Sequence, residues 1–97
     1  MMQMFSPSAL IIDVRDHDYS LGGCIQNAIH IPHFFPSKII DRVNSSPFIF
    51  IYVYCQCGLN RSVKIANILR QNCFGKEIIL VEGGFTQFSD EFRQFVV

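Results

Sequence analysis

The stretch FIFIYVY, from Phe48 to Tyr54, is apolar or aromatic at every position. A strand with one face in water alternates apolar and polar residues, so an unbroken apolar run of this length indicates a strand covered on both faces. In small domains such cover comes from helices that cross above and below a parallel sheet. We therefore predict that residues 48–54 form the central strand of an α/β domain.

The sequence on either side of this stretch continues an alternation of strands and helices. Three more strands are predicted at 9–15 (ALIIDVR), 28–31 and 76–81 (KEIILV). Helices are predicted at 38–43, capped by Ser37, at 61–72, and along a final segment that carries Phe85, Phe88, Phe92 and Phe95 on one core-facing side. The pattern predicts one domain over residues 1–97, with a mainly parallel sheet of four to five strands and helices on both faces.

Composition excludes several classes of partner. The chain has 97 residues, of which 49% are hydrophobic, and its eight Lys and Arg balance eight Asp and Glu. Without a basic excess we expect no nucleic-acid partner. No apolar run approaches the roughly 18 residues of a membrane span, so we expect no membrane partner. Residues 1–7 lack the pattern of a secretory signal, which favours a cytoplasmic location, with the nucleus as an alternative.

The cysteines and histidines show no metal-binding spacing. Cys55 and Cys57 are separated by one residue, and no second pair stands at the spacing of a zinc knuckle. The three histidines, at 17, 30 and 33, do not form a ligand pattern either. We therefore predict no metal and no cofactor, and we expect free thiols in a reducing compartment.

The segment CQCGLNRS, from Cys55 to Ser62, holds the candidate chemistry. It lies between the central strand and a predicted helix, at the sheet edge where ligands of α/β proteins bind. Backbone N–H groups of such a loop can turn inward and form an anion cradle, helped by the helix N-terminus. Cys55 would then ionise readily and act as a nucleophile, and Arg61 could hold two oxygens of a bound oxyanion.

The remaining loop residues have supporting roles in this interpretation. The predicted oxyanion-binding loop consists of Gln56, Cys57, Gly58, Leu59, Asn60, Arg61 and Ser62. Gly58 allows the backbone angles of a tight curl. Ser62 has two interpretations, a cap of the following helix or a hydrogen-bond partner of the Cys55 thiolate. A purely structural interpretation also stands, in which Cys55 is a small buried side chain and Arg61 a polar residue of the first helical turn.

Three motifs resemble the rhodanese-like domains, and together they cover nearly the whole chain. The first is IIDVR at 11–15, followed by Tyr19, GGCI at 22–25 and NAIHIP at 27–32. The second is the loop from Cys55 to Ser62, and the third is EGGF at 82–85 with Phe88. The resemblance implies the rhodanese fold, and it implies that Asp13, Arg15 and Asp18 make a structural ion pair and hydrogen bonds near the loop.

Loop length separates activities within this family. Five residues lie between Cys55 and Arg61, which resembles the Cys-x5-Arg loop of the M-phase inducer dual-specificity phosphatases and related arsenate reductases. The resemblance implies a cradle wide enough for a tetrahedral oxyanion, and a phospho- or arseno-cysteine intermediate. The implied partners are a phosphorylated substrate or small oxyanion and a thiol reductant. In this branch an acidic residue often precedes the arginine, whereas this chain has Asn60.

Two alternatives remain open. The first is a rhodanese-type sulfurtransferase that acts through a persulfide on Cys55. Tyr54, directly before the cysteine, is similar to the residue that sulfurtransferases have there, although their loop has four residues after the cysteine. Rhodanese-like binding modules are a non-catalytic alternative, but they usually lack the cysteine.

A resolving thiol for Cys55 is also expected from the sequence. Val14 stands where the phosphatase branch has a cysteine that protects the nucleophile as a disulfide. A ring between Cys55 and Cys57 would be strained, since one residue separates them. We therefore favour Cys24, in the segment after the first strand, as the resolving partner of Cys55.

Overall fold

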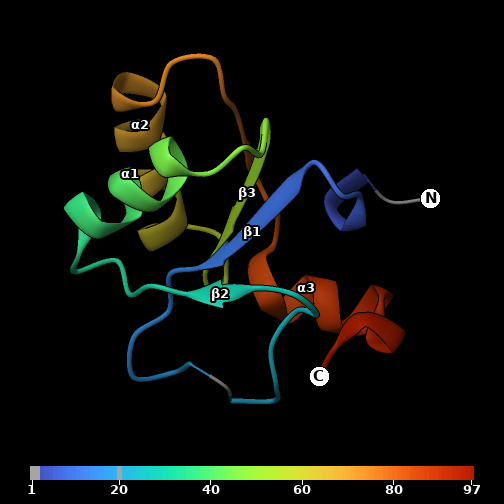
Figure 1. Ribbon diagram of the computed structural model, residues 1–97. Helices are drawn as coiled ribbons and strands as arrows, with labels where there is room; N and C mark the ends of the chain where they lie inside the picture. Colours follow the sequence, from blue (N-terminus) through green and yellow to red (C-terminus); the bar gives the residue numbers. More distant parts are fainter. Residues whose placement is uncertain (1–2, 20) are drawn as a thin grey trace.

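The structure, a computed structural model, describes residues 3–19 and 21–97 (Figure 1). Its centre is a parallel sheet of four strands in the order β2-β1-β3-β4. The strands are β1 (Ala9–Asp13), β2 (Ile29–His30), β3 (Phe50–Tyr54) and β4 (Glu77–Leu80). β3 lies between β1 and β4, which confirms the predicted α/β class and the central position of FIFIYVY.

Three helices cover the two faces of the sheet. They are α1 (Pro36–Ser45), α2 (Arg61–Asn72) and α3 (Gly84–Glu91), with short 3-10 helices η1 (Gln3–Phe5) and η2 (Arg93–Phe95) near the ends. Figure 1 shows α1 and α2 together on one side of the sheet and α3 on the other. In the part of the chain that the structure describes, no helix is long and apolar enough to cross a bilayer.

Strand β3 feeds both hydrophobic cores, which explains its unbroken apolar sequence. Ile51 and Val53 belong to the core beneath α1 and α2. Tyr52 and Tyr54 point to the opposite face, into the core that also contains Phe85 of α3. Because successive side chains of a strand alternate between faces, a strand covered on both sides needs apolar residues throughout.

The predicted element boundaries are mostly close to the observed ones, and α2 matches the predicted 61–72 at both ends. The prediction for α1 was wrong at its start. Pro36 is at the first helical position, Phe35 is the N-cap, and Ser37 lies inside the helix with no side-chain cap. Proline suits this position because its fixed φ is helical and its missing N–H would be unpaired there anyway.

The closing helix is shorter than its phenylalanine spacing predicts. α3 ends at Glu91, and Phe92, with φ of −130°, turns the chain into η2. Phe85 and Phe88 are buried, whereas Phe92 and Phe95 are partly buried against the same core. The aromatic side therefore continues across the break, and the prediction that it faces the core is confirmed.

The parallel register gathers the strand ends at one edge of the sheet. Asp13 at the end of β1 is the register partner of both His30 in β2 and Tyr54 in β3. The segments that follow these three strands therefore leave from neighbouring points. Cys55 is the first residue beyond β3 at this edge.

Candidate active site

Cys55 lies at the buried end of β3, with 2% of its surface exposed. The loop from Gln56 to Asn60 has no regular secondary structure, and α2 begins at Arg61. The predicted arrangement of buried strand, short loop and helix is therefore present. Cys57, Leu59 and Asn60 are exposed on the outer side of this loop.

The amino end of α3 fixes the loop from the other side. The backbone N–H of Phe85 donates to the carbonyl of Cys55 at 2.9 Å, and that of Thr86 donates to the carbonyl of Gln56 at 3.0 Å. Helix N-termini carry N–H groups without helical partners, so they can bind the loop carbonyls in this way. Because the carbonyls of Cys55 and Gln56 face α3, the N–H groups that follow in the loop can turn toward the Cys55 sulfur.

Glycine is required at the contact between α3 and the loop. Gly84 has φ of +61°, and a Cβ atom there would lie 2.5 Å from the Cys55 carbonyl oxygen and 2.7 Å from the Gly58 nitrogen. No side chain fits in that space, and the positive φ itself disfavours other residues. Gly84 of the EGGF motif therefore belongs to the site, a role that could not be assigned from the sequence.

The sulfur of Cys55 lies within hydrogen-bond distance of two groups. The backbone N–H of Gly58 donates to Sγ at 3.3 Å, and the hydroxyl of Ser62 lies 3.2 Å from Sγ. Burial opposes ionisation of this thiol, but the hydrogen bonds from Ser62 and Gly58 and the charge of Arg61 outweigh it and lower the pKa of Cys55. The site therefore favours a thiolate.

The two interpretations of Ser62 can now be separated. α2 has Asn60 as its N-cap residue and no side-chain cap, so Ser62 does not cap the helix. Its hydroxyl is fully buried beside the Cys55 sulfur instead. When Cys55 is ionised, this hydroxyl can donate its proton in a hydrogen bond to the thiolate.

Arg61 is bound by two aspartates of the segment after β1. Its guanidinium donates to both oxygens of Asp18, at 2.8 and 2.6 Å, and to Asp16 at 3.1 Å. The hydrogen bond from Arg61 lowers the pKa of Asp18 to about 2, and the same bond raises the pKa of Arg61. Arg61 thus lies beside the loop, with its fork held by carboxylates.

A buried ion pair connects β1 to the loop. Nε of Arg15 donates to both oxygens of Asp13 at 3.0 Å, and both residues are fully buried. Arg15 also donates to the side-chain oxygen of Gln56 at 3.0 Å, and its guanidinium lies 4.5 Å from the ring centre of Phe85. The hydroxyl of Tyr54 donates to Asp13 at 2.8 Å. This network holds the loop against both β1 and α3.

Asp16 and His33 belong to the site but carry no recognisable signal in the sequence. A ring nitrogen of His33 lies 2.9 Å from the Asp16 carboxylate, and this hydrogen bond lowers the pKa of Asp16. Asp16, His17 and Asp18 each offer one potential metal-ligand atom, and these three atoms lie within 4.8 Å of one another. Both carboxylates already accept hydrogen bonds from Arg61, so this group is an ion-pair cluster.

Cys24 lies on the segment that pairs with the end of the chain. Its backbone exchanges two hydrogen bonds of 2.9 Å with Val97, and its sulfur lies 4.0 Å from the Val97 carbonyl oxygen. All four cysteines are free thiols. Among the described residues, the hydrogen-bond partners of the Cys55 sulfur are Gly58 and Ser62, so the pairing of Cys24 with Cys55 stays a prediction.

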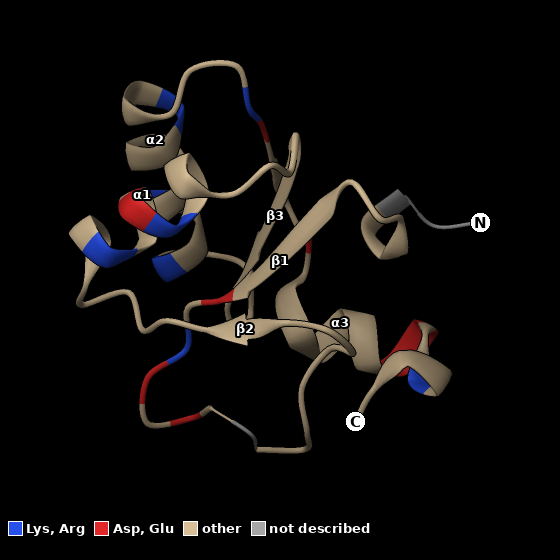
Figure 2. Cartoon of the chain, viewed as in Figure 1, with Lys and Arg blue, Asp and Glu red and all other residues tan. Residues whose placement is uncertain are grey.

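Figure 2 shows how charge is distributed over these elements. Acidic residues lie in the segment after β1, whose aspartates bind Arg61. Lys and Arg are concentrated on α1 and α2. The candidate site therefore lies where an acidic segment meets the basic start of α2.

Solved structures that share this fold include a reductase and a phosphatase. The As-Sb reductase of Leishmania major is 24% identical, with a TM-score of 0.72 over 90% of this chain and 66% of that one. A yeast protein tyrosine phosphatase of the rhodanese family is 18% identical, with a TM-score of 0.68 over 84% of this chain and 67% of that one. At these identities the likeness shows the fold alone.

A rhodanese-like domain protein of Staphylococcus aureus is 31% identical, with a TM-score of 0.65 over 84% of this chain and 74% of that one. The chain spans 66% of the Leishmania reductase and 15% of the CoADR-RHD protein of Bacillus anthracis, so it corresponds to only a part of these proteins. No curated protein sequence matches it. The sequence profile of the rhodanese-like domain matches residues 2–91, and the chain therefore belongs to the rhodanese-like domain family.

Proposed function

We propose that this domain is a cysteine-nucleophile enzyme that acts on a tetrahedral oxyanion, as a phosphatase or an arsenate reductase. The observation that carries the proposal is the convergence of the Gly58 amide and the Ser62 hydroxyl on the sulfur of Cys55, at 3.3 and 3.2 Å. A buried sulfur that accepts from the Gly58 amide, lies beside the Ser62 hydroxyl and has a lowered pKa suits a nucleophile better than a packing role. The five residues between Cys55 and Arg61 favour a tetrahedral oxyanion.

The first step is a displacement at the central atom of the oxyanion. The Cys55 thiolate attacks phosphorus or arsenic, a bond from sulfur forms, and a bond to one oxygen breaks. That oxygen leaves with the electron pair and takes a proton from water. Backbone amides of the loop bind the remaining oxygens, whose charge increases in the transition state.

The second step distinguishes the two activities. In a phosphatase, water attacks phosphorus, the sulfur–phosphorus bond breaks, and inorganic phosphate leaves with regeneration of the thiolate. In an arsenate reductase, an external thiolate attacks the Cys55 sulfur, and the electrons of the sulfur–arsenic bond reduce As(V) to As(III). Arsenite leaves, and a second thiol reduces the mixed disulfide.

The leaving group is restricted by the absence of an acid in the loop. Asn60 precedes Arg61, and an amide does not donate a proton to an alkoxide. Substrates whose leaving group is weakly basic, such as aryl phosphates, or arsenate with a protonated oxygen, are therefore favoured. The names of two structural neighbours, an As-Sb reductase and a tyrosine phosphatase, support the same two activities.

One observation favours a sulfurtransferase as the second candidate. The guanidinium of Arg61 is occupied by Asp18 and Asp16, which leaves the backbone amide of Gly58 as the donor at the sulfur. Such a cradle suits the single negative charge of a persulfide. Cys55 would attack the outer sulfur of thiosulfate, release sulfite, and pass that sulfur from the persulfide to cyanide as thiocyanate.

A parallel assay of the purified protein tests these candidates. The substrates are an aryl phosphate, arsenate with a thiol, and thiosulfate with cyanide. Turnover of either of the first two supports the proposal, turnover of thiosulfate alone supports the second candidate, and no turnover of any substrate contradicts both.

Cys55→Ser and Cys57→Ser form the matched pair of variants for this assay. Cys55→Ser should abolish the activity, since a hydroxyl ionises far less readily than this thiol. Cys57→Ser should keep the activity, because Cys57 is exposed on the loop. Loss of activity in Cys57→Ser with retention in Cys55→Ser would place the nucleophile at Cys57.

A further inference from the structure

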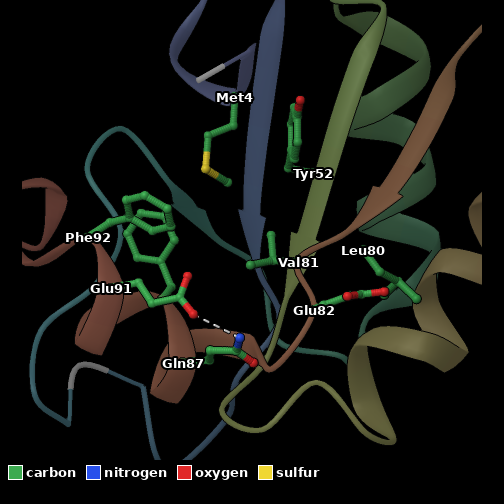
Figure 3. A pocket seen from close by; sticks show the side chains of 9 residues that line it. Met4, Tyr52, Leu80, Val81, Glu82, Gln87, Glu91 and Phe92 are labelled. Atoms are coloured by element: carbon green, nitrogen blue, oxygen red, sulfur yellow. Dashed lines mark hydrogen bonds between the residues drawn. The ribbon is translucent and has the colours of Figure 1, made fainter. Parts of the chain in front are cut away.

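A pocket lies beside the carboxyl-terminal half of α3, whereas the Cys55 loop contacts the amino end of this helix. It is formed between η1, the strands β3 and β4, and the outer turns of α3, and its volume is about 190 Å³. Figure 3 shows Met4 and Tyr52 on one side of it and Gln87, Glu91 and Phe92 of the α3 segment on the other. None of the residues assigned to the candidate active site lines this pocket.

The walls of the pocket are apolar. Met4, Tyr52, Val81, Phe88 and Phe92 supply most of its lining. Phe88 and Phe92 pack with their ring centres 5.4 Å apart. Walls of this kind bind the hydrocarbon part of a ligand, because burial of apolar surface is favourable.

The charged groups of the pocket are both acidic. Glu82, which follows β4, and Glu91 on α3 line it, and no Lys or Arg is among the residues that do. Glu91 is held by Gln87, whose amide donates to its carboxylate at 3.0 Å (Figure 3). A carboxylate oxygen has more than one acceptor position, so Glu91 can accept a further hydrogen bond from a ligand.

The surroundings strengthen this negative charge. Asp90 is the neighbour of Glu91 on α3, and Glu77 at the start of β4 contributes to the raised pKa of Tyr52, after the effect of burial. The basic residues lie mainly on α1 and α2, which cover the other face of the sheet (Figures 1 and 2). Lys76 before β4 and Arg93 after Phe92 are basic residues near this face in the sequence, but Glu77, Glu82, Asp90 and Glu91 outnumber them, so the charge near the pocket favours a cation.

The size of the pocket limits the ligand. Pockets for drug-sized molecules usually measure roughly 300 to 1,000 Å³. A pocket of about 190 Å³ is smaller, so it suits a ligand with one ring or one short chain. Apolar walls with carboxylates on two sides match an apolar body that carries a single positive head group.

From these observations we propose that the pocket is a binding site for a small organic ammonium ion, a primary amine attached to one aromatic ring or a short alkyl chain. The apolar body lies against Tyr52, Val81 and Phe92, and the ammonium group pairs with Glu91, while Glu82 adds a second negative charge to the lining. The site is separate from Cys55, so it does not depend on the proposed activity.

The test is a direct binding measurement on the full chain with three probes of the same shape. 2-Phenylethylamine is the cation, 2-phenylethanol is its neutral counterpart, and 3-phenylpropionate is the anion. Each is titrated into isotope-labelled protein at neutral pH, and backbone amide shifts report both the affinity and the place of binding. We expect the amine to shift residues 81–92 and to bind about tenfold more tightly than the alcohol, the scale of a charge-assisted hydrogen bond.

Two sets of variants complete the test. The double variant Glu82→Gln and Glu91→Gln should weaken amine binding about tenfold and remove the preference over the alcohol. Both residues are exposed, so the fold should be unaffected. The matched control Asp90→Asn removes a neighbouring charge on the same helix that does not line the pocket, and it should weaken amine binding much less than the double variant does.

Three results would overturn the proposal. The first is equal affinity for the amine and the alcohol, and the second is equal weakening by Asp90→Asn and by the double variant. The third is the absence of amine-induced shifts in residues 81–92, whether or not shifts appear in the Cys55 loop. None of these results bears on turnover at Cys55, so failure here is distinct from failure of the proposed activity.

Discussion

Arg61 donates to both carboxylate oxygens of Asp18, at 2.8 and 2.6 Å, across 43 residues of sequence. This is the bidentate geometry with which arginine binds phosphate and related oxyanions. In this structure Asp18 therefore occupies the hydrogen-bonding fork that the Cys-x5-Arg pattern assigns to a bound oxyanion. An oxyanion that uses Arg61 has to compete with Asp18.

Replacing Asp18 by asparagine should therefore tighten oxyanion binding. The neutral amide competes less well for the guanidinium, and we expect vanadate to bind up to about tenfold more tightly to Asp18→Asn, measured by calorimetry. The gain should disappear when Arg61→Lys is added, since lysine cannot form the fork. Weaker binding to Asp18→Asn would mean instead that Asp18 positions Arg61 for the ligand.

The same ion pair makes stability depend on acid pH. Arg61 lowers the pKa of Asp18 from 3.8 to about 2. A carboxyl whose pKa is lower in the folded state stabilises the fold when ionised, so its contribution is present above about pH 4 and is lost as the pH falls to about 2. The pair is partly exposed to solvent, so we expect a contribution of about 1 kcal/mol at most.

Urea unfolding at a series of pH values measures this contribution. In the native protein the free energy of unfolding should fall between about pH 4 and pH 2, and in Asp18→Asn it should fall less over the same range. Identical pH profiles for the two proteins would show that the pair adds nothing to stability.

Gly84→Ala tests whether α3 shapes the Cys55 loop. The added Cβ would lie 2.5 Å from the Cys55 carbonyl oxygen, so the loop or the helix has to move. We expect slower alkylation of Cys55 by iodoacetamide, because the Gly58 amide would no longer be held at the sulfur. We also expect a loss of more than about 1 kcal/mol of stability from the strained backbone and the clash.

Gly75→Ala is the control for backbone strain alone. Gly75 has a similar φ of +77°, but no atom lies within 4 Å of the position of its Cβ. It should lose stability without changing the alkylation rate of Cys55. An equal change of the alkylation rate in both variants would show that the reactivity of Cys55 does not depend on the contact with Gly84.

Much of the fold could be predicted from local patterns. FIFIYVY identified β3 because its side chains enter two cores, and the apolar spacing in 61–72 identified α2. Errors arose where the backbone conformation of single residues decides an element's end. α1 begins at Pro36 and is not capped by Ser37. α3 ends before Phe92, although the phenylalanine spacing continues beyond it.

The candidate site was predictable only in part, because its partners are distant in sequence. The order Cys55, loop, helix is local and could be read directly. The sequence also left two roles for Ser62, and only the geometry separates them. The binding of Arg61 by Asp18, and of the loop carbonyls by α3, depends on which strand ends meet at the sheet edge. Periodicity does not contain that information.

The last prediction concerns oxidation of Cys55. Its lowered pKa makes the thiolate available to peroxide: sulfur attacks one oxygen, the O–O bond breaks, and sulfenic acid forms with release of water. A second thiol can then attack that sulfur, form a disulfide and release water. We expect Cys24 to be this second thiol, after it separates from Val97, since Gly22 and Gly23 precede it and allow the segment to rearrange.

Mass spectrometry of non-reduced peptides after peroxide treatment decides this prediction. The native protein should contain a link between Cys24 and Cys55 that dithiothreitol reverses. In Cys24→Ser, Cys55 should proceed to sulfinic acid, which thiols do not reduce, whereas Cys57→Ser should behave as the native protein does. Irreversibly oxidised Cys55 in the native protein, with Cys24 still open to alkylation, would show that Cys24 does not protect it. A link between Cys55 and Cys57 would assign the role to the nearer thiol, despite the strain of so short a ring.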